Sequence, residues 1–241
     1  MNSESGLASQ RIDRLPAQLA GIRISLTDKH VRLELPEPWR VCGWAPLGGG
    51  LTMTRQMFIL KVAGDAGCPS LGYSPPETTL ERYHAYHGWP GPVMGMMTAA
   101  SMDSCRISWR LENGVAVLVV LTAGLTNARR AGDRADCRWD DEYSPPAGTI
   151  NILAATNANL ADASLVEALM IMTEAKSAVL QEHGVTSPVS GLTATGTGTD
   201  CAAVACGYGL PIRWCGKHVA FGEMLAKAVM EALASSLAWD G

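Results

Sequence analysis

The eight residues from Thr193 to Asp200, with the sequence TATGTGTD, combine four hydroxyl groups, two glycines and one carboxylate. They stand directly before the apolar run 201–206, which has the length of a buried strand. Glycine permits a positive φ and lets a ligand approach the backbone closely. A carboxylate at the mouth of a buried strand costs free energy unless it has a partner, so Asp200 marks a candidate site. The alternative interpretation is a turn rich in small residues.

The stretch does not match the glycine-rich motifs that bind nucleotides. The dinucleotide fingerprint G-x-G-x-x-G would require glycine at position 201, where Cys201 stands. The phosphate-binding loop would require glycine at position 211 and Ser or Thr after Lys217, and the chain has Pro211 and His218 there. Neither nucleotide-binding fold is therefore supported.

Composition limits the partners and the compartment. The 19 basic and 23 acidic residues are interspersed and give a net charge of -4, which argues against a nucleic-acid partner. The longest apolar run, 115–121, is far too short to cross a membrane, and the N-terminus lacks the pattern of a secretory signal. Seven cysteines without any C-x-x-C pair favour neither a disulfide framework nor a structural zinc site. We therefore expect a cytoplasmic protein, and the sequence leaves a homo-oligomer open.

Hydrophobic patterning predicts strands first and long helices last. Residues 22–35 alternate as a hairpin that Pro36 and Pro38 should end, with another short strand over 41–44. Asn113-Gly114 between apolar runs predicts a second hairpin. Further strands are expected at 93–100, 150–155 and 201–206, and helices at 75–86, 165–183 and 218–238. Capping boxes at Ser74–Glu77 and Ser164–Glu167 should open the first two helices.

These elements predict an α+β fold, with a mixed sheet, hairpins in the N-terminal half and two long C-terminal helices covering the sheet. We expect a flexible arm over residues 1–20 and a single domain over 21–241. Small and hydroxyl residues recur at the ends of apolar strands, in the segments 97–101, 121–125, 154–157 and 193–196. Gathered together, they would form a shallow cleft with many hydrogen-bonding groups; close packing of sheets explains them equally well.

Six segments in order resemble one known family. They are MMTAASMDS (96–104), TAGLTNARRAGD (122–133), GTINIL (148–153), TEAKSA (173–178), TGTGTD (195–200) and GKH (216–218). Together they resemble the adenosylcobinamide amidohydrolase family over nearly the whole chain, from Arg23 to Leu237.

The resemblance implies an enzyme of corrinoid salvage in prokaryotes. Members hydrolyse the amide that joins the aminopropanol linker to a corrin ring propionate of adenosylcobinamide, which releases adenosylcobyric acid. The cobalt then enters with the substrate, so no cofactor is required, although a divalent metal is not ruled out. The alternatives are a corrinoid-binding carrier or sensor without hydrolysis, and a general amidase of small amides.

Amide hydrolysis needs a nucleophile, a proton shuttle and stabilisation of the oxyanion. Our hypothesis makes Asp200 and Glu174 the paired acid/base carboxylates, with His218 moving or positioning a proton. Thr197, Thr199 and backbone amides near Gly198 would hold the carbonyl oxygen. Asp200→Asn should then abolish turnover and leave folding intact.

Other assignments remain open for the same residues. Thr197 or Thr199 could be the nucleophile, or Asp200, Glu174 and His218 could hold a divalent metal that activates water. Glu174 could instead only pair with Lys176 or Lys217. The remaining substrate-binding candidates are polar residues at strand ends and before the last helix, namely Asn127, Asn151, Thr98 and Lys217.

Overall fold

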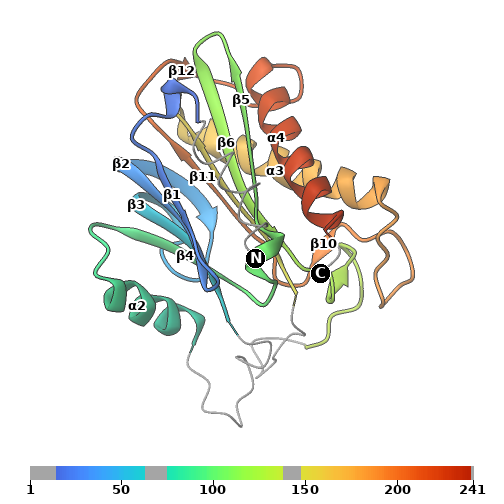
Figure 1. The fold of residues 1–241 in the computed structure, drawn as a ribbon. Helices are drawn as coiled ribbons and strands as arrows, with labels where there is room; N and C mark the ends of the chain where they lie inside the picture. Colours follow the sequence, from blue (N-terminus) through green and yellow to red (C-terminus); the bar gives the residue numbers. More distant parts are fainter. Residues whose placement is uncertain (1–14, 63–74, 138–147, 240–241) are drawn as a thin grey trace, which may run out of the picture.

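The computed structural model describes residues 15–62, 75–137 and 148–239. Eight of the described strands form one mixed sheet in the order β4-β3-β2-β11-β8-β6-β5, with β1 paired to β2 (Figure 1). The strands of this sheet are β1 (Arg23–Leu26), β2 (His30–Trp44), β3 (Gly50–Lys61), β4 (Val93–Thr98), β5 (Arg106–Glu112), β6 (Val115–Ala123), β8 (Ile150–Thr156) and β11 (Cys201–Cys206). Two small sheets pair β7 (Ala128–Arg129) with β10 (Gly196–Thr197), and β9 (Asn159–Leu160) with β12 (Pro211–Ile212).

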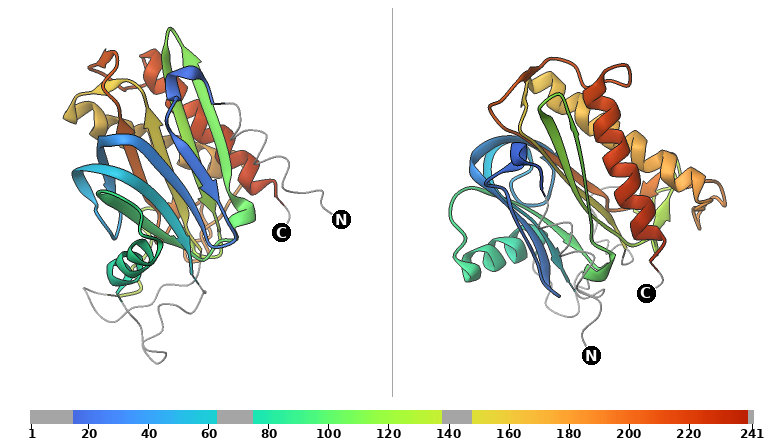
Figure 2. Two further views of the ribbon diagram at one scale, coloured as in Figure 1. Left: turned by 60° about the vertical axis from the view of Figure 1, so that its left-hand side comes forward. Right: turned by 45° about the horizontal axis from the view of Figure 1, so that its top comes forward.

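Helices cover the sheet on both outer sides. Helices α3 (Asp162–Glu182) and α4 (Ala220–Leu237) pack on the half of the sheet that contains β6, β8 and β11 (Figures 1 and 2). Successive strand residues point to opposite faces, so Val119 packs under these helices and Val120 faces β2, β3 and β4. Helix α2 (Pro76–His87) packs through Leu80 on Phe58 of β3, on the far side. The predicted α+β fold with two C-terminal helices on a mixed sheet is confirmed.

The hairpin predictions hold, but β2 is longer than expected. Pro36 and Pro38 do not end it, because the pairing of β2 with β3 shifts register between Glu34 and Trp39. Proline is tolerated at such an irregularity, where a ladder hydrogen bond is already missing. Strand β3 was not predicted at all. The Asn113-Gly114 turn is confirmed, with positive φ at both residues and antiparallel pairing of β5 with β6.

The predicted capping box at Ser164–Glu167 is wrong. Helix α3 begins at Asp162 without a side-chain cap. Ser164 donates instead to the Arg213 carbonyl at 2.7 Å, and Glu167 accepts from the Cys215 amide at 2.5 Å. These two side chains therefore fix the loop before α4 rather than the helix start. The other proposed cap, Ser74, lies outside the described residues.

One edge of the sheet collects several polar strand ends. Strands β8 and β11 run parallel, with Asn151 beside Cys201, and Thr122 of β6 lies opposite Asn151. The Asn151 amide donates to the Met97 carbonyl of β4 at 2.7 Å, which brings β4 to the same edge. Thr156 lies at the other end of β8 and donates to the Ala116 carbonyl at 2.7 Å. Three of the four small-residue segments therefore gather at one edge, and the segment 154–157 does not.

The first described residues pack against this sheet. A 3-10 turn, η1 (Ala17–Leu19), places Leu19 in the core between the two halves of the sheet, with 1% of its surface exposed. Residues 1–14 of the expected arm lie outside the described residues. No described helix is long and apolar enough to span a bilayer.

Candidate functional site

Asp200 lies directly before β11 and accepts four hydrogen bonds. Its Oδ1 accepts from the Thr197 hydroxyl at 2.5 Å and from the Ile150 amide at 3.0 Å. Its Oδ2 accepts from the Thr197 amide at 3.0 Å and from the Lys176 ammonium. A carboxylate offers about four lone-pair positions, and here each has a donor. The Thr197 hydroxyl is thus the only alcohol that Asp200 contacts in this set.

Lys176 is the partner that the buried carboxylate required, and sequence reasoning missed its importance. It forms a salt bridge with Asp200 in which the two side chains are 8% and 10% exposed. Lys176 lies on the inward side of α3, next to the buried residues Ala175 and Val179. A lysine on the apolar side of a helix was the signal that could have identified it, because lysine is rarely buried without a partner.

Gly196 makes room for this ion pair. A Cβ at this position would collide with Asp200 Oδ2 and would lie 2.6 Å from Lys176 Nζ. Position 196 therefore has to be glycine for the salt bridge to keep its geometry. Gly196 is therefore needed for the close packing of a charged pair. It is not needed for a positive φ, because the backbone has none at this residue.

The remaining residues of the segment are held by the neighbouring strand end. Thr199 Oγ1 donates to the Gly148 carbonyl at 3.0 Å, and Thr149 Oγ1 donates to the Thr199 carbonyl at 2.8 Å. Asn127 Nδ2 lies 3.5 Å from Thr199 Oγ1, and the Asn127 carbonyl accepts from the Gly198 amide at 3.3 Å. Thr197, Gly198, Thr199 and Asn127 are therefore neighbours in space, as the sequence hypothesis requires.

Asn151 and Thr98 lie deeper, on the face of the sheet between its two halves. Besides its bond to Met97, Asn151 accepts from Thr149 Oγ1 at 3.4 Å, and none of its surface is exposed. Thr98 is 2% exposed and accepts from the Ala100 amide at 3.0 Å. Asn151 thus ties β8 to β4 in this structure. Its predicted role in binding the substrate stays a prediction.

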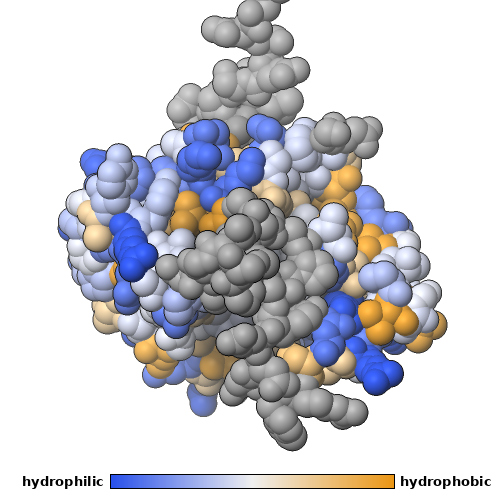
Figure 3. Space-filling model, turned by 90° about the horizontal axis from the view of Figure 1, so that it is seen from below, coloured by the Kyte–Doolittle hydropathy of each residue, from blue (hydrophilic) through white to orange (hydrophobic). Residues whose placement is uncertain are grey.

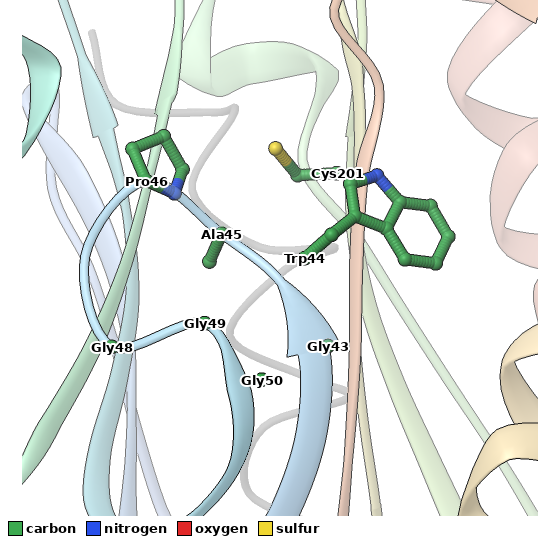
Figure 4. A pocket seen from close by; sticks show the side chains of 8 residues that line it. All are labelled: Gly43, Trp44, Ala45, Pro46, Gly48, Gly49, Gly50 and Cys201. Carbon is green, nitrogen blue, oxygen red and sulfur yellow. The ribbon is translucent and has the colours of Figure 1, made fainter.

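A pocket of about 770 Å³ opens beside Asp200. Residues between Gly43 and Gly50 line it, together with Cys201. Figure 4 shows the Cys201 sulfur directed toward Pro46, while the Trp44 indole extends away from Pro46. Burial raises the pKa of the Cys201 thiol to about 11, and the adjacent Asp200 carboxylate adds to the shift. The thiol is therefore neutral at ordinary pH and a weak nucleophile.

Comparison with known proteins identifies the family. The sequence model of the adenosylcobinamide amidohydrolase family matches residues 15–240, which is nearly the entire chain. The chain belongs to the adenosylcobinamide amidohydrolase family. An adenosylcobinamide amidohydrolase of Halobacterium salinarum is 30% identical over 213 residues, covering 85% of this chain and 83% of the relative. One of Methanosarcina mazei is 26% identical over 205 residues, covering 81% and 88%.

The chain is also similar to a protein without a described function and, weakly, to solved structures. An uncharacterized protein of Methanocaldococcus jannaschii is 30% identical over 190 residues, covering 68% of this chain and 74% of that protein. Among solved structures, a Burkholderia sp. beta-aminopeptidase has a TM-score of 0.47 at 13% identity, covering 91% of this chain and 84% of that chain. A TM-score below 0.5 does not establish a shared fold.

The sequence hypothesis groups Glu174 and His218 with Asp200. The structure places both of them away from Asp200. Glu174 forms an exposed ion pair with Lys217, with side chains 46% and 65% exposed. At 3.6 residues per turn, Glu174 and Lys176 point about 200° apart around α3, so the helix lies between Glu174 and Asp200. His218 is exposed in the turn that precedes α4. The structure therefore brings Lys217 to Glu174, and Lys176 to Asp200.

A metal centre was one of the open alternatives. Within residues 15–62, 75–137 and 148–239, no three side chains of His, Cys, Asp or Glu converge in a way that could hold a metal ion. The particular ligand set of Asp200, Glu174 and His218 is not assembled there, because its two carboxylates are engaged by different lysines. Turnover measured with and without a chelator tests directly for a divalent metal.

Proposed function

We propose that this protein hydrolyses the amide bond between the aminopropanol linker and the corrin ring propionate of adenosylcobinamide. The products are adenosylcobyric acid and aminopropanol. Family membership over residues 15–240 and the polar sheet edge around Asp200 support this activity. We further propose that Thr197 is the nucleophile, and the observation that carries this assignment is its 2.5 Å hydrogen bond to Asp200.

The occupied lone pairs of Asp200 favour Thr197 over a water molecule as the attacking group. A water that Asp200 activates would have to displace one of four donors, two of which are backbone amides. The Thr197 hydroxyl already points its proton at the carboxylate, which is the arrangement of a nucleophile with its base. Lys176, on the other oxygen, orients the carboxylate and compensates its charge.

The reaction then proceeds in two steps. Thr197 Oγ1 forms a bond to the amide carbon, and its proton passes to Asp200. The carbon–nitrogen bond breaks, the proton goes to the leaving amine, and an ester of Thr197 remains. Water attacks this ester, which gives the free propionate and restores the threonine hydroxyl.

The substrate carbonyl has a place beside this hydroxyl. Gly198 is exposed, and a Cβ there would have only Asn127 Nδ2 at 3.6 Å and an Arg129 carbon at 3.9 Å close by. A carbonyl group could approach this open backbone and accept from the Asn127 amide. Side-chain amides that point at developing negative charge are recurrent oxyanion stabilisers.

The test is turnover of adenosylcobinamide, followed by mass spectrometry of adenosylcobyric acid, with and without a chelator. Thr197→Ala should lower kcat by at least about a thousandfold, and Thr197→Ser should retain activity because it keeps a hydroxyl. Thr195→Ala is the matched control, since Thr195 lies two residues before Thr197 and its hydroxyl accepts from the Ala131 amide. Normal turnover by Thr197→Ala would refute the nucleophile, and loss of activity with chelator would favour metal-activated water.

A further inference from the structure

Trp44, the last residue of β2, contacts the main chain of Asp200. Its indole Nε1 donates to the Asp200 carbonyl at 2.7 Å. Trp44 pairs with Ala202 of β11, so the indole extends along the neighbouring strand to the residue that precedes β11. Strand β2 therefore holds the main chain of the residue whose carboxylate takes part in the proposed reaction.

A close approach of β2 to β11 brings the indole within reach of this carbonyl. A Cβ at Gly43 would lie 2.6 Å from the Ala202 carbonyl oxygen, so any larger residue would push the two strands apart. On the other side of Trp44, Leu47 exchanges hydrogen bonds with Gly95 of β4 at 3.3 and 3.0 Å. Trp44 therefore stands on a backbone that is anchored both before and after it.

The indole and the Asp200 carboxylate lie on the same face of the sheet. Successive side chains of a strand alternate between the two faces. Cys42 packs against the hydrophobic cluster under α3 and α4, so Trp44, two residues later, points to the same side. Figure 4 shows the indole extending away from Pro46. Lys176 reaches the Asp200 carboxylate from α3 on this face. Asp200 is thus held twice, by β2 through its main chain and by α3 through its carboxylate.

Burial alone does not account for an indole at position 44. Trp44 is 43% exposed, so its ring gains less from burial than a core tryptophan does. An exposed tryptophan can also belong to a docking surface. Viewed from below, however, the described residues show hydrophobic groups interspersed with hydrophilic ones rather than one continuous apolar surface (Figure 3). The property that distinguishes an indole from other large apolar side chains is its N–H donor, and this donor is bonded to Asp200.

The place of the Asp200 main chain decides where the carboxylate lies relative to Thr197. The Thr197 hydroxyl donates to Oδ1 at 2.5 Å, and the Thr197 amide donates to Oδ2 at 3.0 Å. Both residues belong to one short turn, 197–200, so a shift of the Asp200 main chain moves the base away from the hydroxyl. A misplacement of about 1 Å can lower a reaction rate about a hundredfold.

We propose that Trp44 is a positioning residue for the amide hydrolysis. Its indole N–H holds the Asp200 main chain so that the carboxylate stays in hydrogen-bond contact with the Thr197 hydroxyl. This assignment rests on the proposed function, which makes Thr197 the nucleophile and Asp200 its base. Trp44 acts through Asp200, so its replacement should slow the chemical step and leave binding of the substrate unchanged.

Amide hydrogen exchange of the free protein measures this positioning without substrate. The amides of Thr197 and Ile150 both donate to the Asp200 carboxylate, each at 3.0 Å. Trp44→Phe keeps an aromatic ring and removes the N–H donor, so both amides should exchange about threefold faster or more in residue-resolved NMR measurements. Trp214→Phe is the matched control, because Trp214 is also exposed, at 59%, and lies in the loop before α4. Circular dichroism establishes that each variant is folded.

Kinetics with adenosylcobinamide separate positioning from binding of the substrate. Trp44→Phe should lower kcat about tenfold or more and keep KM within about threefold of wild type. Trp44→Leu, which also removes the ring, should again lower kcat alone, because the ring itself is not needed to bind the substrate. Trp214→Phe should keep kcat and KM close to those of the wild type.

Three results would overturn the role of Trp44. Unchanged exchange of both amides in Trp44→Phe would show that the indole does not hold Asp200. Faster exchange with wild-type kcat would make the hydrogen bond purely structural, and a raised KM with unchanged kcat would assign Trp44 to binding of the substrate. If the wild type releases no adenosylcobyric acid, the proposed hydrolase is refuted, and the exchange rates still show whether Trp44 holds Asp200. The two failures are therefore distinguishable.

Discussion

Replacing Lys176 by methionine removes the ammonium group that compensates Asp200 and keeps a side chain of similar length. The carboxylate then stays buried with three donors instead of four. Because the side chains of the pair are only 8% and 10% exposed, water cannot take over the role of the lysine without rearrangement. Breaking a buried pair by removing one partner typically costs about 3–5 kcal/mol.

That cost should be visible in thermal and urea unfolding. For a chain of this size, 1 kcal/mol corresponds to about 2–4 °C in Tm, so Lys176→Met should lower Tm by about 6–20 °C. Asp200→Asn should be destabilising as well, since it leaves the ammonium without its counter-ion. This revises the expectation from sequence that Asp200→Asn leaves folding intact.

The double variant Lys176→Met/Asp200→Asn separates pairing from packing. It buries no charge at this position, so its loss of stability should be smaller than the sum of the two single losses by more than about 1 kcal/mol. Additive losses, or single losses below about 1 kcal/mol, would refute the view that these two residues form one buried unit. The exposed pair Glu223–Lys227, with side chains 58% and 60% exposed, is the control, and Lys227→Met should change stability little.

Two further outcomes follow from other charged groups. Glu174→Gln should change the free energy of unfolding by less than about 1 kcal/mol, because the ion pair of Glu174 with Lys217 is exposed. The variant should also keep kcat/KM for adenosylcobinamide within about threefold of wild type. A loss of turnover would support the paired-carboxylate hypothesis instead. Burial, with nearby His87 and Arg32, lowers the pKa of His30 from 6.5 to about 4. The unfolded chain then binds more protons than the folded one between these pH values, so the free energy of unfolding should fall as the pH drops from 6.5 to 4. His30→Gln should flatten this dependence in urea titrations, and an unchanged slope would show that His30 is not responsible.

Local signals in the sequence identified most elements of the fold. The Asn113-Gly114 hairpin follows from the positive φ that both residues adopt, and Gly184, with a φ of +63°, ends α3 as expected. Strand β3 was missed, and β2 was ended too early at Pro36. The second error has a physical cause, because a register shift in a paired strand depends on its neighbour rather than on its own residues.

The candidate site was identified in part. The cost of burying a carboxylate pointed to Asp200 and to a partner, and the hydroxyls of Thr197 and Thr199 lie where the sequence hypothesis placed them. Periodicity along α3 separates Lys176, on the apolar side, from Glu174, but it does not say which carboxylate the lysine meets. The packing of α3 on β11 shows that this carboxylate is Asp200.

The contacts of Asp200 also constrain how the chain folds. Its donors come from Ile150, 50 residues away, and from Lys176, 24 residues away, so β8, α3 and β11 must meet before the carboxylate is satisfied. A partly docked α3 would leave one charge desolvated and alone, which raises the free energy of every intermediate of that kind. The β8–α3–β11 unit should therefore close in a single cooperative step, and the site exists only in chains that have completed it.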